Sequence, residues 1–232
     1  MNVPLRVFCF WTDHHPMSDV RRSCLEKMQT QFSQERIELI LVTQETLDQW
    51  VLADFPIHPA YECLSATHRS DYLRCYFMHL HGGGYSDVKT PNGKWIHAFK
   101  HLNEDPHAYL VGYREVGPHG IADSSHPSLN LIREQWYRLV GCGAFACRSK
   151  TPLTTQWFRQ LHHVMDENSE ELEKHPATEP REVIHKALPN GRQSEYPLRW
   201  AQVLSEIFHP ICFDNALHLR QSLLLPNCET YL

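Results

Sequence analysis

Short apolar runs alternate with stretches of helical periodicity in the first part of the chain. Residues 5–11 are rich in β-branched and aromatic side chains and predict a buried strand that ends in a polar turn. Ser18 and Asp19 can cap a helix that runs to about Phe32. A second strand is expected at 37–43 and a second helix at 44–54. This alternation with short links favours a largely parallel sheet covered by helices on both sides.

The middle of the chain predicts one long helix over 61–81, which Gly82, Gly83 and Gly84 stop. Further strands are expected at 85–88, 109–114 and 139–148, and further helices at 151–174 and 199–208. Two polar segments lack periodicity: 117–130 is expected to be a long surface loop, and 175–196 a mobile excursion. No repeat and no linker divides the chain, so we expect a single domain.

Composition narrows the class of protein. The chain has 232 residues, 42% of them hydrophobic, which suffices for a sizeable core. The formal net charge is −5 with histidine neutral, and no lysine- or arginine-rich run stands out. This balance disfavours a dedicated nucleic-acid binder, so no nucleic-acid partner is expected.

The cysteines and the N-terminus bear on location. No pair among the eight cysteines has the two-residue spacing of a zinc knuckle or a redox motif, so we expect reduced, structural thiols. The first residues lack the hydrophobic region and cleavage site of a signal peptide, and the apolar runs are too short to span a bilayer. These patterns predict a soluble, cytoplasmic protein without a transmembrane segment, and leave its oligomeric state open.

The most informative stretch runs from Ser65 to Lys89. Asp71 and Arg74 are three residues apart, so on a helix they share one side and can present a carboxylate and a planar donor fork to one ligand. The three glycines then allow a tight turn and bring Asp87 close to the following strand. Taken alone, such a pair is more commonly an ordinary salt bridge within a helix.

The whole string resembles the core of DXD-type glycosyltransferases with a GT-A fold, in particular the sugar-binding-region and capsular-polysaccharide-synthesis families of bacteria and large DNA viruses. Those families read roughly Ser-Asp-x-x-Arg and then Gly-Gly-x-Tyr-x-Asp-x-Asp, and this chain has Ser-Asp-Tyr-Leu-Arg and Gly-Gly-Gly-Tyr-Ser-Asp-Val-Lys. The opening strand, its proline-containing loop and the helix from Val20 to Met28 extend the resemblance over residues 5–91. It implies an α/β fold with a Rossmann-like mixed sheet flanked by helices, in one domain over 1–232. Residues 1–91 would form the nucleotide-sugar-binding half and residues 92–232 the acceptor side.

The implied activity is transfer of a sugar from a nucleotide-diphosphate sugar, expected to be a UDP-sugar, to a hydroxyl of a glycan acceptor in polysaccharide biosynthesis. Retention at the anomeric carbon follows from the same kinship. The resemblance implies catalytic roles for Asp71, Arg74 and Lys89, and metal ligation by Asp87 and His209. The implied substrate-binding residues are Trp11, Thr12, Asp13, Asp71, Arg74, Gly83, Gly84, Tyr85, Asp87 and Lys89. Trp11, expected beside the nucleotide, fits a core indole equally well.

Position 89 departs from the family pattern, because Lys89 stands where the second aspartate usually binds the metal. An ammonium has three donors and no lone pair, so it cannot coordinate a divalent cation. Lys89 could itself neutralise the departing diphosphate. Alternatively, Asp87 and a distant residue hold a largely hydrated Mn²⁺ or Mg²⁺ while Lys89 turns outward. A solvated lysine at a strand end is the third interpretation.

Other candidates are weaker. His209 and then His218 follow the family order for a ligand near the C-terminus, although with 17 histidines a surface or capping role is the more common outcome. Glu115 and Asp123 could meet an acceptor, but solvated loop carboxylates are commoner. No His-Glu-x-x-His, nucleophile-elbow or phosphate-loop pattern occurs, which argues against a zinc hydrolase, a serine hydrolase and a P-loop enzyme.

We expect the site at the ends of the strands at 5–11 and 109–114, in the crevice typical of open α/β sheets. A second hypothesis comes from another functional class. Because of Lys89, the chain could be a non-catalytic nucleotide-sugar-binding or regulatory module derived from such an enzyme.

Overall fold

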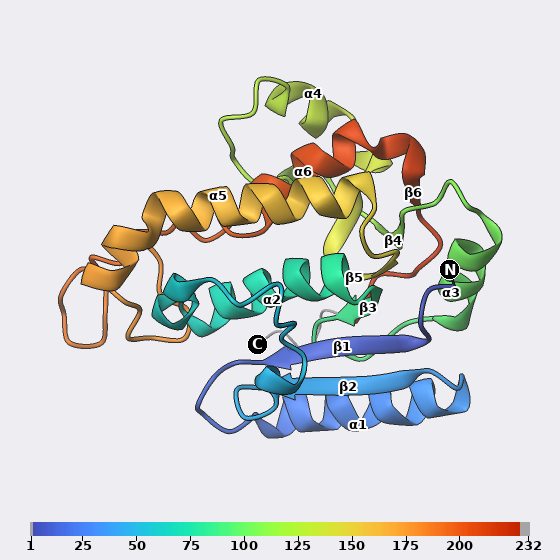
Figure 1. Ribbon diagram of the computed structural model, residues 1–232, viewed down its shortest axis with the longest axis horizontal. Coiled ribbons are helices and arrows are strands. Elements are labelled where there is room, and N and C mark those ends of the chain that lie inside the picture. The colour runs from blue at the N-terminus through green and yellow to red at the C-terminus, as the bar shows by residue number, and fades with distance from the viewer. Residues whose placement is uncertain (1, 228–232) are drawn as a thin grey trace.

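The protein is an α/β structure built on one six-stranded sheet (Figure 1). The computed structural model describes residues 2–227. The strands lie in the order β2-β1-β3-β5-β4-β6. Their bounds are β1 Arg6–Trp11, β2 Glu38–Thr43, β3 Gly83–Ser86, β4 Leu110–Arg114, β5 Val140–Cys147 and β6 Leu219–Arg220.

The sheet is mixed. β1 pairs in parallel with β2 and β3, whereas β5 is antiparallel to both β3 and β4, and β6 is parallel to β4. The helices are α1 Asp19–Gln34, α2 Ala66–Leu80, α3 Ile96–Glu104, α4 Leu129–Glu134, α5 Pro152–Lys174 and α6 Ser205–Asp214. The expected mixed sheet flanked by helices is confirmed, in an arrangement compatible with a Rossmann-like fold.

Alternation along β1 divides the core between the two faces of the sheet. Val7 and Cys9 pack with apolar residues of α1 and α3, while Phe8 and Phe10 pack with those of α2, α5 and α6. Figure 1 shows the same division, with α1 below the sheet and α2 and α5 above it. Helix α2 therefore lies between the sheet and α5, and most of its residues are buried.

Several expected elements differ in extent. The helix expected at 44–54 is wrong: only a 3-10 turn forms at Leu47–Gln49, because the Thr46 hydroxyl accepts from the Thr43 amide and closes a local turn. The long helix expected at 61–81 is split into a 3-10 helix, Pro59–Cys63, and α2. Ser65 between them is extended, and its hydroxyl caps α2.

The second half shows three further differences. The last helix begins at Ser205 rather than at residue 199, because residues 199–204 form turns held by the bond from the Arg199 amide to Gln202 Oε1. The patterns at α3, α4 and β6 were too short to predict. The segment 175–196 contains neither helix nor strand, as expected, but buried contacts described below tie it to α2.

The seven cysteines within residues 2–227 are free thiols, and Cys228 lies outside this range. Among the same residues, no helix is long and apolar enough to pass through a membrane.

Candidate functional site

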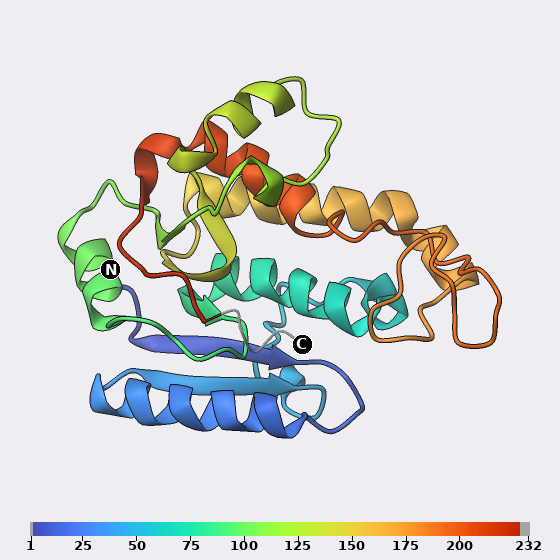
Figure 2. The ribbon, with the colours of Figure 1, turned by 180° about the vertical axis from the view of Figure 1, so that it is seen from behind.

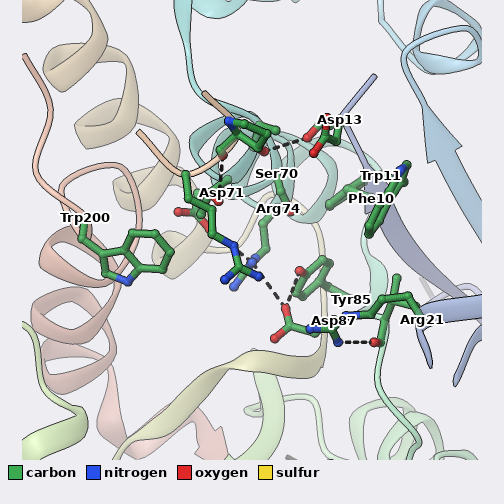
Figure 3. A pocket seen from close by; sticks show the side chains of 16 residues that line it. Phe10, Trp11, Asp13, Arg21, Ser70, Asp71, Arg74, Tyr85, Asp87 and Trp200 are labelled. Carbon is green, nitrogen blue, oxygen red and sulfur yellow. Dashed lines mark hydrogen bonds and ion pairs between the residues drawn. The ribbon is translucent and has the colours of Figure 1, made fainter. Parts of the chain in front are cut away.

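A pocket of about 290 Å³ opens where β1 and β3 end beside α2 (Figure 3). It is lined by Phe10, Trp11, Thr12, Asp13, Arg21, Ala66, Thr67, Ser70, Asp71, Arg74, Tyr85, Asp87, Val88, Pro180, Arg181 and Trp200. The end of β1 supplies one wall, α2 and the residues after β3 supply the floor, and segments far along the chain supply the opposite wall. The site was expected at the ends of the first strand and of 109–114. The end of the first strand does border this pocket. The other strand that borders it is β3, and not β4, which corresponds to 109–114.

Helix α2 places two charged side chains at the floor. Asp71 and Arg74 are buried, and Arg74 Nη2 lies 3.2 Å from Asp71 Oδ1, as the three-residue spacing predicts. Burial raises the pKa of Asp71 to about 7, although the neighbouring Arg74 opposes that rise. At neutral pH this carboxyl therefore exchanges its proton readily and can either donate or accept a hydrogen bond.

The glycine bend sets the position of the third charged group. Gly83 has φ of +100°, and a Cβ there would lie 2.9 Å from the carbonyl oxygen of Arg6, so only glycine fits this approach to β1. β3 then runs for four residues, and Asp87 follows it directly. The Asp87 amide donates to the Gly143 carbonyl at 2.8 Å, which fixes its backbone beside β5.

The Arg74 guanidinium connects these groups. It donates from Nη1 to the Cys142 carbonyl at 2.6 Å and lies 4.1 Å from the centre of the Tyr85 ring. Its Nη2 also approaches Asp87 Oδ1 at 3.5 Å. Burial opposes the charge of Arg74, but Tyr85, Asp71 and Asp87 outweigh it and raise its pKa. Arg74 therefore stays charged and fixes both carboxylates.

Asp87 is enclosed by donors from this chain. Its Oδ1 accepts from the Tyr85 hydroxyl at 2.7 Å, and its Oδ2 lies 2.9 Å from Lys89 Nζ. Burial alone would raise the pKa of Asp87, but Arg74, Lys89 and Tyr85 together hold it below its usual value. Asp87 is thus an ionised carboxylate at the edge of the pocket.

The end of β1 forms the first wall. Trp11 is partly exposed and lines the pocket, so it is not a core indole, and its Nε1 donates to the His15 carbonyl at 3.0 Å. Thr12 donates to the Ala66 carbonyl at 2.7 Å, which ties this wall to the start of α2. Asp13 accepts from the His15 amide.

The opposite wall belongs to residues 177–200, called the strap below. Pro180, Arg181 and Trp200 line the pocket, and Figure 3 shows Trp200 across from Trp11, with Asp71 and Arg74 between them. The Pro180 carbonyl accepts from the Thr67 amide at 3.0 Å. Figure 2 shows the strap, in orange, beside the start of α2.

Buried polar contacts hold the strap in place. His68, on α2, shares a hydrogen bond with the Tyr196 hydroxyl at 2.8 Å through Nδ1, and its Nε2 faces the Arg199 carbonyl at 3.1 Å. Within the strap, the buried Glu182 carboxylate accepts from the Ser194 hydroxyl and from the amides of Thr178 and Glu179. The second wall is thereby attached to the same helix that carries Asp71 and Arg74.

Most residues that the sequence predicts for the site lie at this pocket. Trp11, Thr12, Asp13, Asp71, Arg74, Tyr85 and Asp87 line the pocket together. Gly83, Gly84 and Lys89 do not line it: the glycines lie within β3, and Lys89 contacts Asp87 from beside the pocket. The residues that sequence reasoning missed are chiefly Arg21, Arg181 and Trp200. The signal that the sequence offered for this wall was a tryptophan, Trp200, shortly after the polar segment 175–196.

The remaining candidates lie elsewhere. His209 is 1% exposed on α6 and does not line the pocket, and its Nε2 lies 3.3 Å from Glu115 Oε2. His218 stacks on Tyr109 with the ring centres 4.0 Å apart, and Asp123 pairs with Arg133. Glu115 is buried rather than solvated.

The pocket side chains that the structure describes do not fit a divalent cation. Within residues 2–227, no three His, Cys, Asp or Glu side chains come together as a metal site. Asp87 already faces Lys89 and Arg74, and its expected partner His209 lies beside Glu115 instead.

Comparison with known proteins yields no family model and no curated protein that matches this chain.

Proposed function

We propose that this protein is a glycosyltransferase of the GT-A type, which moves a sugar from a nucleotide-diphosphate sugar to a hydroxyl of a glycan acceptor. The observation that carries the proposal is the shared pocket. Asp71, Arg74 and Asp87 come from two separate segments of the motif that resembles such enzymes, and they line one hollow with Trp11 and Thr12.

The charges of the pocket suit a diphosphate. Its lining includes three guanidinium groups, from Arg21, Arg74 and Arg181, and Lys89 adjoins it. Arg74 is engaged by Asp71, Asp87 and Cys142, so it acts by holding the floor. The exposed Arg181 forms no ion pair with any residue in the range 2–227, which leaves its guanidinium able to bind an anion at the mouth of the pocket.

The two tryptophans suggest how the substrates divide the pocket. Trp11 adjoins the end of β1, where nucleotides bind in open α/β sheets, so we assign the base to that wall. Trp200 is 55% exposed on the opposite wall and offers an apolar face of the kind on which sugar rings pack. We assign the acceptor glycan to the strap side.

The reaction needs little covalent chemistry from the protein. The bond from the anomeric carbon to the diphosphate oxygen breaks, and its electron pair stays on the phosphate. The acceptor oxygen bonds to the same carbon, and its proton passes to the departing phosphate oxygen. The negative charge on the leaving group grows as the bond lengthens, and the cations around the floor stabilise it. Retention at the anomeric carbon follows from the resemblance.

The test is direct incubation with donors. The protein is mixed with UDP-, GDP- and dTDP-sugars in Mn²⁺, Mg²⁺ or EDTA, with and without crude glycan acceptors, and release of the nucleotide diphosphate is measured. We expect release with at least one donor, lost in Asp87→Ala and retained in Asp123→Ala, a surface carboxylate outside the pocket.

Two other outcomes contradict the proposal in different ways. Donor binding without release under every condition identifies a nucleotide-sugar-binding module, for which a buried and already paired Asp87 is the supporting observation. Absence of binding for every donor rejects a nucleotide-sugar site altogether.

A further inference from the structure

Lys89 is a buried cation fixed on the carboxylate that would otherwise bind a metal. Its side chain is 8% exposed, and Nζ lies 2.9 Å from Asp87 Oδ2. The solvated lysine considered from the sequence is therefore wrong, and so is a lysine turned outward. The ammonium instead stands against the side of Asp87 opposite Tyr85, whose hydroxyl occupies Oδ1.

This arrangement leaves a divalent cation little to bind. Mg²⁺ and Mn²⁺ need several oxygen lone pairs, and an ammonium has none. A cation approaching Asp87 must displace Lys89 from Oδ2 or sit beside two existing positive charges, those of Lys89 and Arg74. The other carboxylate of the floor, Asp71, is engaged by Arg74 at 3.2 Å.

The four buried groups also balance one another. Within residues 2–227, the carboxylates of Asp71 and Asp87 face the cations of Arg74 and Lys89, so this set of four is neutral when Asp71 is ionised and positive when Asp71 is protonated. A divalent cation would add two charges to a buried group that is already compensated, and such an excess is costly away from water.

We propose that Lys89, held on Asp87, takes the place of a divalent cation at this site, so that the protein binds a nucleotide diphosphate and stabilises its departure without metal. This inference rests on the proposed function. The ammonium lies at the edge of the pocket, where its positive charge opposes the negative charge that the diphosphate gains when the sugar leaves. No co-reactant is required, since the bond changes are those of the transfer itself.

The first test uses Mn²⁺ alone, with no nucleotide. Electron paramagnetic resonance measures free Mn²⁺ in a titration of the protein. We expect no binding at the site by the natural chain and measurable binding by Lys89→Asp, which sets two carboxylates two residues apart. Lys27→Asp, on an exposed position of α1, is the matched control and should behave like the natural chain. Tight binding by the natural chain, or none by a folded Lys89→Asp, overturns the inference.

The second test measures binding of UDP, GDP and dTDP by calorimetry in EDTA and in Mn²⁺. We expect the affinity of the natural chain to be the same in both, and Lys89→Met to bind about tenfold or more weakly in EDTA, the typical loss for one charge-assisted contact. Lys89→Arg keeps the charge and should retain most of the affinity, which separates loss of charge from loss of folding.

The two failures are distinguishable. If Mn²⁺ strengthens nucleotide binding by the natural chain tenfold or more, the metal-free site is wrong while the proposed function survives. If no nucleotide diphosphate binds in either condition, the proposed function is wrong, and the Mn²⁺ titration alone then decides whether Lys89 excludes a cation.

Discussion

The two carboxylates of the pocket floor lie close together but have opposite electrostatic surroundings. Asp87 faces Arg74, Lys89 and the Tyr85 hydroxyl, which together hold its pKa below the usual value despite burial. Asp71 has Arg74 alone as a cationic neighbour, and burial raises its pKa to about 7. The two pKa values differ because Asp87 faces more cations and hydrogen-bond donors than Asp71 does. Burial does not explain the difference, since the same elements enclose both carboxylates.

Substitution by asparagine should change the stability of the protein by different amounts at Asp71 and at Asp87. Asp71→Asn mimics the protonated acid, so we expect a change in the free energy of unfolding of less than about 1 kcal/mol near pH 4, where the folded-state carboxyl holds its proton. Asp87→Asn leaves Lys89 buried without its carboxylate, and should cost about 3–5 kcal/mol. Chemical denaturation measures both, and equal losses for the two variants would contradict the assignment.

The pH dependence of stability supplies the control. Because the folded-state pKa of Asp71 is raised from 3.8 to about 7, the folded protein holds a proton that the unfolded chain has released between those values. Its contribution to stability is complete below the unfolded pKa and is lost as pH rises through about 7. Relative to Asp71→Asn, the natural chain should lose stability from pH 4 to pH 7, and a flat difference would show that Asp71 titrates normally. Both proteins share every other titration, so the difference isolates Asp71.

At the scale of elements, the site depends on how α2 is connected to β3. The helix begins only at Ala66, because Ser65 is extended and caps it, and this start sets which face Asp71 and Arg74 present. The chain then reverses through the glycines and enters the sheet beside β1. Gly83 cannot be replaced by a residue with a side chain without strain, since both its φ and the nearby carbonyl of Arg6 exclude a Cβ.

Alanine at two glycines of positive φ should therefore differ in cost. Gly191 has φ of +79° in the strap, and a Cβ there meets nothing within 4 Å. Gly191→Ala should cost only the backbone strain of about 1 kcal/mol. Gly83→Ala adds a clash with the backbone of β1, and we expect a loss of about 3 kcal/mol or more in thermal or chemical unfolding. Similar losses for both would mean that β1 and β3 adjust to the added atom.

At the scale of the whole molecule, the pocket is closed by residues that are far apart in sequence. Trp11 follows the first strand, whereas Trp200 lies just before the last helix, and the strap brings them to one hollow through His68 and Thr67 of α2. Helix α2 thus holds the floor, the first wall and the strap together.

The two walls should contribute to different substrates. Trp11→Ala should weaken binding of the nucleotide diphosphate by about tenfold, in line with a stacking contribution of about 1–3 kcal/mol. Trp200→Ala should leave that affinity nearly unchanged and raise the KM for a glycan acceptor. Tyr137→Ala, an exposed aromatic outside the pocket, is the control in both assays. If Trp200→Ala weakens nucleotide binding as much as Trp11→Ala does, the division of the pocket is wrong.

The sequence alone determined the features that depend on neighbours along the chain. Periodicity predicted β1, α1, β2 and α5 to within a few residues, because amphipathic faces and caps are local. The spacing of Asp71 and Arg74 fixed their pairing for the same reason. The 3-10 turn at Leu47–Gln49 and the late start of α6 escaped prediction, because bonds from Thr46 and Gln202 compete with helix formation there.

The tertiary structure decided what the pocket contains. No local pattern could place Arg181 and Trp200 opposite Trp11, since that depends on buried hydrogen bonds between α2 and a segment more than 100 residues later. The local sequence also could not show whether the Lys89 ammonium faces water or Asp87, because a lysine at this position is compatible with either orientation. The contacts between α2 and the strap settle the first question. Burial settles the second, because the fold encloses Lys89 together with Asp87 away from water.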